Sequence, residues 1–152
     1  MELFRKVELS MYYYIKNKVD TRVGAGIVTT ELDYPNMEEL GTKLLPPLVA
    51  VMCSATSDWD AELGNLAPKT FEWFIEIYTL DKGQRADLLS IVWEALNEGI
   101  TINDYDAGFT SPPSLGTMVP RDRNSRSAPF FESLNEILYW RAVLSFSTDS
   151  IV

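Results

Sequence analysis

The chain has 152 residues, 46% of them hydrophobic, which is enough for one domain with a buried core. With 13 basic and 22 acidic side chains its net charge is -9, which disfavours non-specific binding to nucleic acid or to an anionic membrane as the main role. Histidine is absent, so histidine-based catalytic triads and zinc sites are excluded. No apolar run is long enough to span a membrane, and we expect a soluble protein made inside the cell.

The charge changes sign along the chain. Residues 1–22 carry five basic and three acidic side chains, whereas residues 23–110 carry four basic and fifteen acidic ones. Residues 111–129 are basic again, with three arginines and one aspartate. A small basic segment therefore follows a strongly acidic middle, and we expect the two to favour contacts between molecules.

The first predicted element is a helix over residues 2–19, with an apolar side that includes Val7, Met11 and Ile15. Tyr12 and Tyr13 interrupt its polar side, so the helix is either covered on two sides or in contact with another subunit. Two glycines at positions 24 and 26 end the helix, and a short strand is predicted over residues 27–32.

The next strand is predicted over residues 48–56, which are almost all apolar, as in a strand covered on both faces. Cys53, the only cysteine, lies within it and is expected to be a buried structural thiol. The acidic turn that follows contains Asp58, Asp60 and Glu62, whose spacing is typical of a solvated turn, although metal binding there stays open. A second strand over residues 70–79 is expected to pair with the first as a hairpin.

Residues 69–98 organise the predicted fold. The strand at 70–79 alternates, with one dry face made of Phe71, Trp73, Ile75 and Ile77. A helix over residues 84–98 carries an apolar stripe, which includes Ile91 and should cover that face. Its predicted ends are a capping box of Asp81 with Gln84 and a left-handed Gly99. The opposite strand face holds Glu72 and Glu76, about 13 Å apart along the strand and too distant to act as a catalytic pair.

Residues 100–129 are predicted to form a long irregular loop because turn-forming residues and prolines are frequent there. Asp104 and Asp106 form a second carboxylate cluster, for which metal binding again stays open. Residues 115–128, with Arg121, Arg123 and Arg126, are expected to be exposed and mobile. The last strand is predicted over residues 138–147.

These elements predict an α+β fold in a single domain, residues 1–152, with a mostly antiparallel sheet of about four strands and two helices packed on it. No nucleotide-binding, cofactor-binding or hydrolase motif occurs in the sequence. We therefore expect a protein that is not an enzyme and that needs no cofactor.

The layout resembles the tail-terminator and neck proteins, also called head-tail joining or tail-completion proteins, of long-tailed bacteriophages. The likeness lies in residues 45–51, the strand at 71–77, the helix at 86–96 and the closing strand at 139–146. It implies a virion structural protein that forms a ring, commonly a hexamer, at the junction of tail and head. Such a ring stops the growth of the tail tube and contacts the tube protein and the head connector, while DNA passes without specific binding. The layout does not separate a tail terminator from another neck protein.

Under this resemblance, Arg121, Arg123, Arg126 and Phe109 are the expected contacts with a neighbouring subunit or with the tail tube. The alternative from another class is an acidic inhibitor or immunity-type protein that masks a basic nuclease or toxin. Such a protein would be a stable monomer that binds one cationic partner, whereas a ring protein would associate with itself or with tail tubes.

Overall fold

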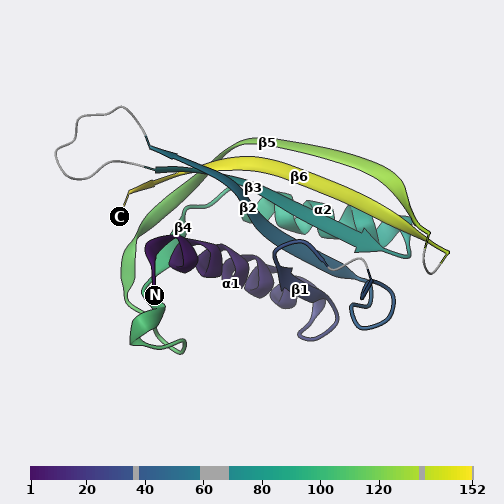
Figure 1. Ribbon diagram of the computed structural model, residues 1–152, viewed down its shortest axis with the longest axis horizontal. Coiled ribbons are helices and arrows are strands. Elements are labelled where there is room, and N and C mark those ends of the chain that lie inside the picture. Colours follow the sequence, from purple (N-terminus) through teal and green to yellow (C-terminus); the bar gives the residue numbers. More distant parts are fainter. Residues whose placement is uncertain (36–37, 59–68, 134–135, 152) are drawn as a thin grey trace.

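The computed structural model describes residues 1–35, 38–58, 69–133 and 136–151 (Figure 1). Two α-helices, a short 3-10 helix and a six-stranded sheet make up the described part of the chain. In chain order they are α1 (Leu3–Val23), β1 (Thr29–Leu32), β2 (Leu48–Asp58), β3 (Lys69–Thr79), α2 (Lys82–Ala95), β4 (Ile100–Asn103), η1 (Tyr105–Ala107), β5 (Ser114–Glu132) and β6 (Ile137–Ile151). No helix of the described residues is long and apolar enough to cross a membrane.

The sheet has the strand order β1-β2-β3-β6-β5-β4 and is mixed, because β1 pairs with β2 in parallel while the other neighbours are antiparallel. The predicted hairpin of β2 with β3 is confirmed, with Val49 opposite Ile77 and Val51 opposite Ile75. The α+β class is also confirmed. The predicted number of about four strands is wrong, since β4 and β5 extend the sheet to six. The sheet is antiparallel except where β1 pairs with β2.

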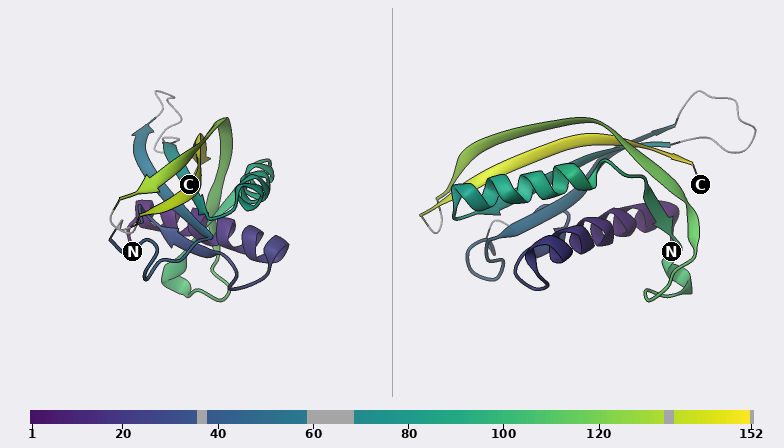
Figure 2. Two further views of the ribbon diagram at one scale, coloured as in Figure 1. Left: turned by 90° about the vertical axis from the view of Figure 1, so that its right-hand side faces the viewer. Right: turned by 180° about the vertical axis from the view of Figure 1, so that it is seen from behind.

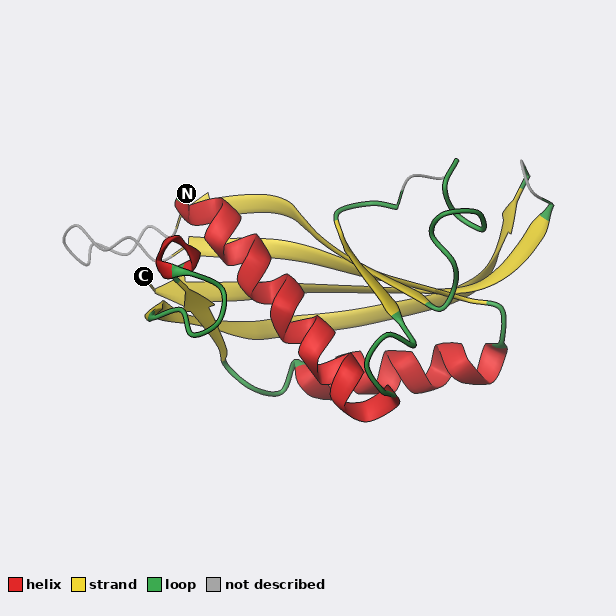
Figure 3. Cartoon of the chain, turned by 90° about the horizontal axis from the view of Figure 1, so that it is seen from below, coloured by secondary structure: helices red, strands yellow, loops and turns green. Residues whose placement is uncertain are grey.

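Both helices pack on one face of the sheet, which arches over them (Figures 2 and 3). The predicted dry face of β3 lies in this core, and Ile91 of α2 packs in the same cluster with only 8% of its surface exposed. Helix α1 adds Val7, Met11 and Ile15. The predicted packing of helix on sheet is thus confirmed, and we call this side of the sheet the helix face.

Two of the helix ends predicted from capping residues and glycines are confirmed, and a third is wrong. The Asp81 carboxylate accepts a hydrogen bond from the backbone N–H of Gln84 at 2.8 Å, so the predicted N-cap is confirmed. Helix α1 runs to Val23 and ends at Gly24, whose φ of 117° suits glycine. The left-handed end expected at Gly99 is wrong: α2 ends at Ala95, with Leu96 as its C-cap. A Cβ at Gly99 would lie 3.2 Å from the Thr117 methyl carbon, so this glycine instead permits close contact with β5.

The long irregular loop predicted over residues 100–129 is wrong. Residues 100–103 form β4, and residues 114–132 form β5, which pairs with β6 from Thr117 to Glu132. Most β5 side chains are exposed, so the strand lacks the alternating apolar pattern that identifies strands in a sequence. Backbone hydrogen bonds to the apolar strand β6 hold β5 in the sheet. Because these bonds do not depend on whether the side chains are polar, the sequence pattern does not reveal them.

In the part of the chain that the structure describes, no helix lies on the opposite face of the sheet, which is covered only in part. A small cluster of Leu40, Leu48, Tyr78 and Tyr139 closes one end of it. The rest, which we call the open face, lies along β3, β6 and β5. Along β2, residues 48–52 are buried as predicted, whereas Cys53 is only partly buried and residues 54–56 are exposed. The expected coverage of the whole strand and the expected buried thiol are therefore wrong.

Tyrosines of α1 that interrupted its predicted polar side are contacted within the chain. The Tyr12 hydroxyl donates to the backbone oxygen of Thr30 at 3.2 Å, and the Tyr13 ring lies 5.6 Å from that of Tyr105. Of the two explanations that the sequence left open, coverage on a second side therefore accounts for these contacts.

Candidate functional site

Strand β5 carries all three candidate arginines, and an irregularity in it sends them to different faces. Its register with β6 shifts between Arg121 and Asn124, where Asp122 has a left-handed φ of 56°. An extra residue in a strand reverses the alternation of side chains. Arg121 and Arg126 consequently share the open face, whereas Arg123 turns toward α2.

Arg123 is held by helix α2. Its guanidinium donates to the backbone oxygen of Trp93 at 2.7 Å and lies 4.8 Å from the centre of the Trp93 ring. The oxygen belongs to the last turn of α2, where a cation is favoured by the helix dipole. This arginine therefore fastens β5 to α2 and is not available to a partner in this conformation.

Arg121 is also engaged within the chain. Its Nε donates to Asp149 on β6 at 2.7 Å, and an Nη1 atom contacts Asp122. The pair with Asp149 is exposed enough that its contribution to stability is small. Of the three arginines, Arg126 alone has a side chain that makes no ion pair or hydrogen bond with any described residue.

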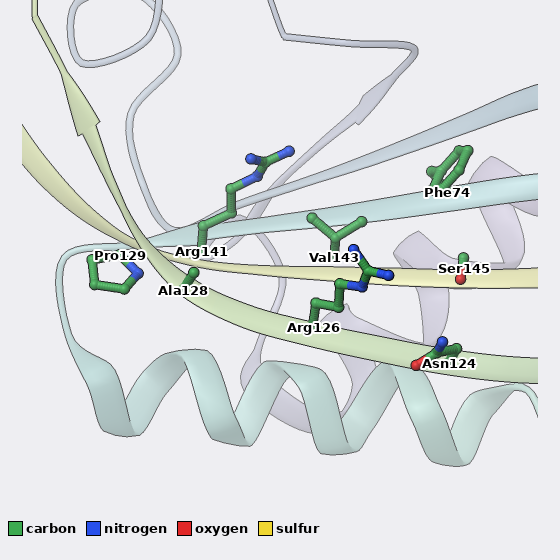
Figure 4. Close-up of a pocket in the computed structure, with 8 residues that line it drawn as sticks. All are labelled: Phe74, Asn124, Arg126, Ala128, Pro129, Arg141, Val143 and Ser145. Carbon is green, nitrogen blue, oxygen red and sulfur yellow. The ribbon is translucent and has the colours of Figure 1, made fainter.

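A pocket of about 480 Å³ lies on the open face beside Arg126 (Figure 4). Phe74 of β3 and Val143 of β6 form its apolar floor, and their side chains point away from α2. The lining residues are Phe74, Asn124, Arg126, Ala128, Pro129, Arg141, Val143 and Ser145. A half-buried apolar floor with a cationic rim is the chemistry of a protein contact.

One end of this pocket is a buried polar network. Arg141 Nη2 lies 2.5 Å from Glu76 Oε1, and the Tyr78 hydroxyl donates to Glu76 Oε2 at 2.6 Å. Burial raises the pKa of Tyr78 well above its usual range, and the hydrogen bond to the Glu76 carboxylate adds to that effect. The Arg141 guanidinium also stacks over the Tyr78 and Phe130 rings. Contacts within the chain thus hold Arg141 in place at one wall of the pocket. The side chain of Arg126, which has no such contacts with described residues, is the cation that can pair with a partner.

Phe109, the fourth predicted contact, lies far from this pocket in the fold, beyond η1. Phe109 is 59% exposed, and its ring stacks on Tyr105 at 5.2 Å between ring centres. Tyr13 of α1 contacts both rings, with its centre 6.1 Å from that of Phe109, so the three rings form one cluster. The structure therefore does not bring Phe109 together with the three arginines.

The carboxylate clusters have separate environments. Asp104 and Asp106 both contact Lys6 Nζ, at 2.8 and 2.7 Å, and the N-terminal amine also reaches Asp106. Lys6 lowers the pKa of both carboxyl groups, so these acids stay ionised and their charges are balanced by cations of the same chain. The cluster of Asp58, Asp60 and Glu62 lies outside the part of the chain whose side chains are described. Glu76 is buried in the polar network while Glu72 is exposed, so those two do not form a pair.

The sequence did not lead us to predict the apolar floor of the open-face pocket. Phe74 and Val143 are the large apolar residues on strand faces that are otherwise polar, with Glu72 and Glu76 beside the first and Arg141 and Ser145 beside the second. Glu76 lies opposite Val143 in the pairing of β3 with β6, with Phe74 opposite Ser145, so the two apolar residues are diagonal neighbours. That signal was present in the sequence but required the strand register.

No protein-family model matches the chain, and no curated protein matches it. A solved structure does. A chain described as "Virion of native gene transfer agent (GTA) particle" aligns over 96% of this chain and 96% of its own length, with a TM-score of 0.52 and 14% sequence identity. At this identity the likeness concerns the fold, which the two chains share over nearly their whole length.

Proposed function

We propose that this chain is a structural protein of a phage-like virion that forms a ring at the end of the tail tube. The observation that carries the proposal is the shared fold with a chain of a gene transfer agent virion, which extends over almost the whole of both chains. An alignment that leaves little of either chain unmatched supports a protein of the same architecture.

Within the virion we assign it the role of tail terminator. The order of elements is the one for which the sequence resembles tail-terminator and neck proteins, and β3, α2 and β6, which carry that resemblance, form the centre of the fold. The open face with its pocket supplies a surface for another subunit, for the tube protein or for the head connector. In this role the protein works as a homo-oligomer, which we take to be a hexamer, and DNA passes through it without specific binding.

The charge of the chain is compatible with this role. A net charge of -9 repels phosphate, so a DNA strand can pass the ring without being retained. The proposal gives the protein no catalytic task and no cofactor.

The test is deletion of the coding sequence in the virus or element that produces the protein, followed by electron microscopy of the particles. A tail terminator is expected to leave tail tubes of uncontrolled length and heads that are not joined to tails, and a plasmid copy should restore both. Tails of normal length that fail to join heads would favour a neck protein instead. Normal, joined particles would contradict both roles, and a stable one-to-one complex with a cationic protein would favour an inhibitor.

A further inference from the structure

The two long sides of the sheet differ in their unpaired charges. One side ends in β1, beside α1, and the other ends in β4 and in the part of β5 beyond its pairing with β4. Strands β2, β3 and β6 separate β1 from β5, so these two edges lie about 19 Å apart at the usual strand spacing. Groups on opposite edges therefore cannot meet within one molecule.

The β1 edge carries a group of acids. Glu8 of α1 is partly buried, and Asp33 directly follows β1; among the described groups, the backbone N–H of Tyr34 donates to the Asp33 carboxylate at 2.8 Å. No lysine or arginine of the described part of the chain pairs with either acid. Burial raises the pKa of Glu8, and the charge of Asp33 raises it further. Glu31 on β1 adds a third acid to this edge.

At the β5 edge, the unpaired charge is positive. Arg126 has no acidic partner among the described residues, and it lies at the rim of the pocket floored by Phe74 and Val143. A cation beside an apolar surface can bind a carboxylate whose own neighbours are apolar, because the ion pair and the apolar contact then form together. Tyr34, 62% exposed, and Leu32 are the apolar neighbours of Asp33.

We infer that the open-face pocket of one molecule receives the β1 edge of a second copy, with Arg126 paired to the acids around Glu8 and Asp33. The two surfaces are different patches of the same chain, so the contact is head-to-tail and generates a ring when its rotation closes. The inference rests on the proposed ring and names the surfaces that would build it. Charge complementarity selects a second copy as the occupant, because this chain carries both halves of the contact.

Sedimentation equilibrium of the full-length protein at low salt tests the contact by charge reversal. Arg126→Glu and Glu8→Lys should each weaken self-association at least tenfold, because each places like charges together. The double variant, and an equimolar mixture of the two single variants, should both recover association, because in each case opposite charges meet again. Recovery by mixing is specific to a contact between these two patches, because neither single variant can form it with its own copies.

Arg22→Glu is the matched control, since it makes the same charge change at an exposed pair with Glu94 away from both surfaces. It should associate like wild type, and circular dichroism should show all variants folded. The inference is overturned if wild type never self-associates, if the single variants behave like the control, or if neither the double variant nor the mixture recovers.

Failure of the contact and failure of the proposed function give different results. Single variants that assemble and terminate tails normally would remove the contact and leave the tail role standing. A protein that associates and recovers as expected, but whose deletion leaves particles normal, would keep the contact and remove the tail role.

Discussion

Arg141 on β6 lies diagonally across the strand pairing from the buried carboxylate of Glu76 on β3, with 2.5 Å between Nη2 and Oε1. Only 5% of the Glu76 side chain is exposed, so the guanidinium is what makes a charge tolerable at that position. Arg141 also lines the open-face pocket, so the same side chain contributes to the stability of the sheet and to the shape of the candidate site.

Loss of Arg141, the cationic partner of Glu76, should destabilise the folded protein. We expect Arg141→Ala to lower the free energy of unfolding by about 3 to 5 kcal/mol, since it leaves a buried carboxylate without its cation. Urea denaturation near pH 7 measures the loss. The double variant Arg141→Met with Glu76→Gln should recover part of it, and a single variant that loses less than about 0.5 kcal/mol would show that Glu76 does not depend on Arg141.

Arg123 and Arg126 differ by three positions but should respond differently to truncation. Arg123→Ala removes a charge-assisted hydrogen bond and the stacking on Trp93, so we expect a loss of about 1 to 3 kcal/mol. Arg126→Ala, which breaks no ion pair or side-chain hydrogen bond with a described residue, should change stability by less than about 0.5 kcal/mol. Parallel thermal unfolding of both variants is the measurement, and equal losses would contradict their separate roles.

The stripe of α2 is the main helical contribution to the core on β3. Ile91→Ala should cost about 2 to 4 kcal/mol, because Ile91 is buried among the residues of the helix face. Asp87→Ala, at an exposed position of the same helix, should cost less than about 0.5 kcal/mol and serves as the control. A loss at Ile91 as small as that of the control would remove the stripe from the core.

The ion pairs of Lys6 predict a dependence on pH. Lys6 lowers the pKa of Asp104 and Asp106 below the ordinary 3.8, so the contribution of these carboxylates is present above that value and is lost as the pH falls through the lowered pKa values. Lys6→Met should therefore unfold at a lower temperature than wild type near pH 7. The difference should shrink toward about pH 2. A difference that is independent of pH would assign the effect to packing of the lysine stem.

Backbone pairing should protect β5 despite its exposed side chains. Amide hydrogen exchange is expected to be slow in the residues of β5 that bond to β6, and slower than in the turn after η1. Trypsin should consequently cut slowly after Arg126 in the native protein. Rapid exchange throughout residues 115–128 would restore the mobile loop that the sequence suggested.

The sequence by itself determined the parts of the fold whose side chains alternate or repeat. Phe71, Trp73, Ile75 and Ile77 identified β3 and its dry face, Ile91 marked the stripe of α2, and Asp81 marked where that helix begins. In these elements the burial of side chains decides the structure, and side-chain polarity is what a sequence displays.

Only the tertiary structure decided the rest. Strand β5 is held by its backbone pairing with β6, and a shift of register near Asp122 separates Arg121 and Arg126 from Arg123. The open-face pocket requires Phe74, Val143 and Arg126 from three neighbouring strands, and the acids around Glu8 and Asp33 come from two elements at the other edge. Such groupings depend on strand order and register, which are set by long-range pairing between segments whose own residue patterns do not specify their partners.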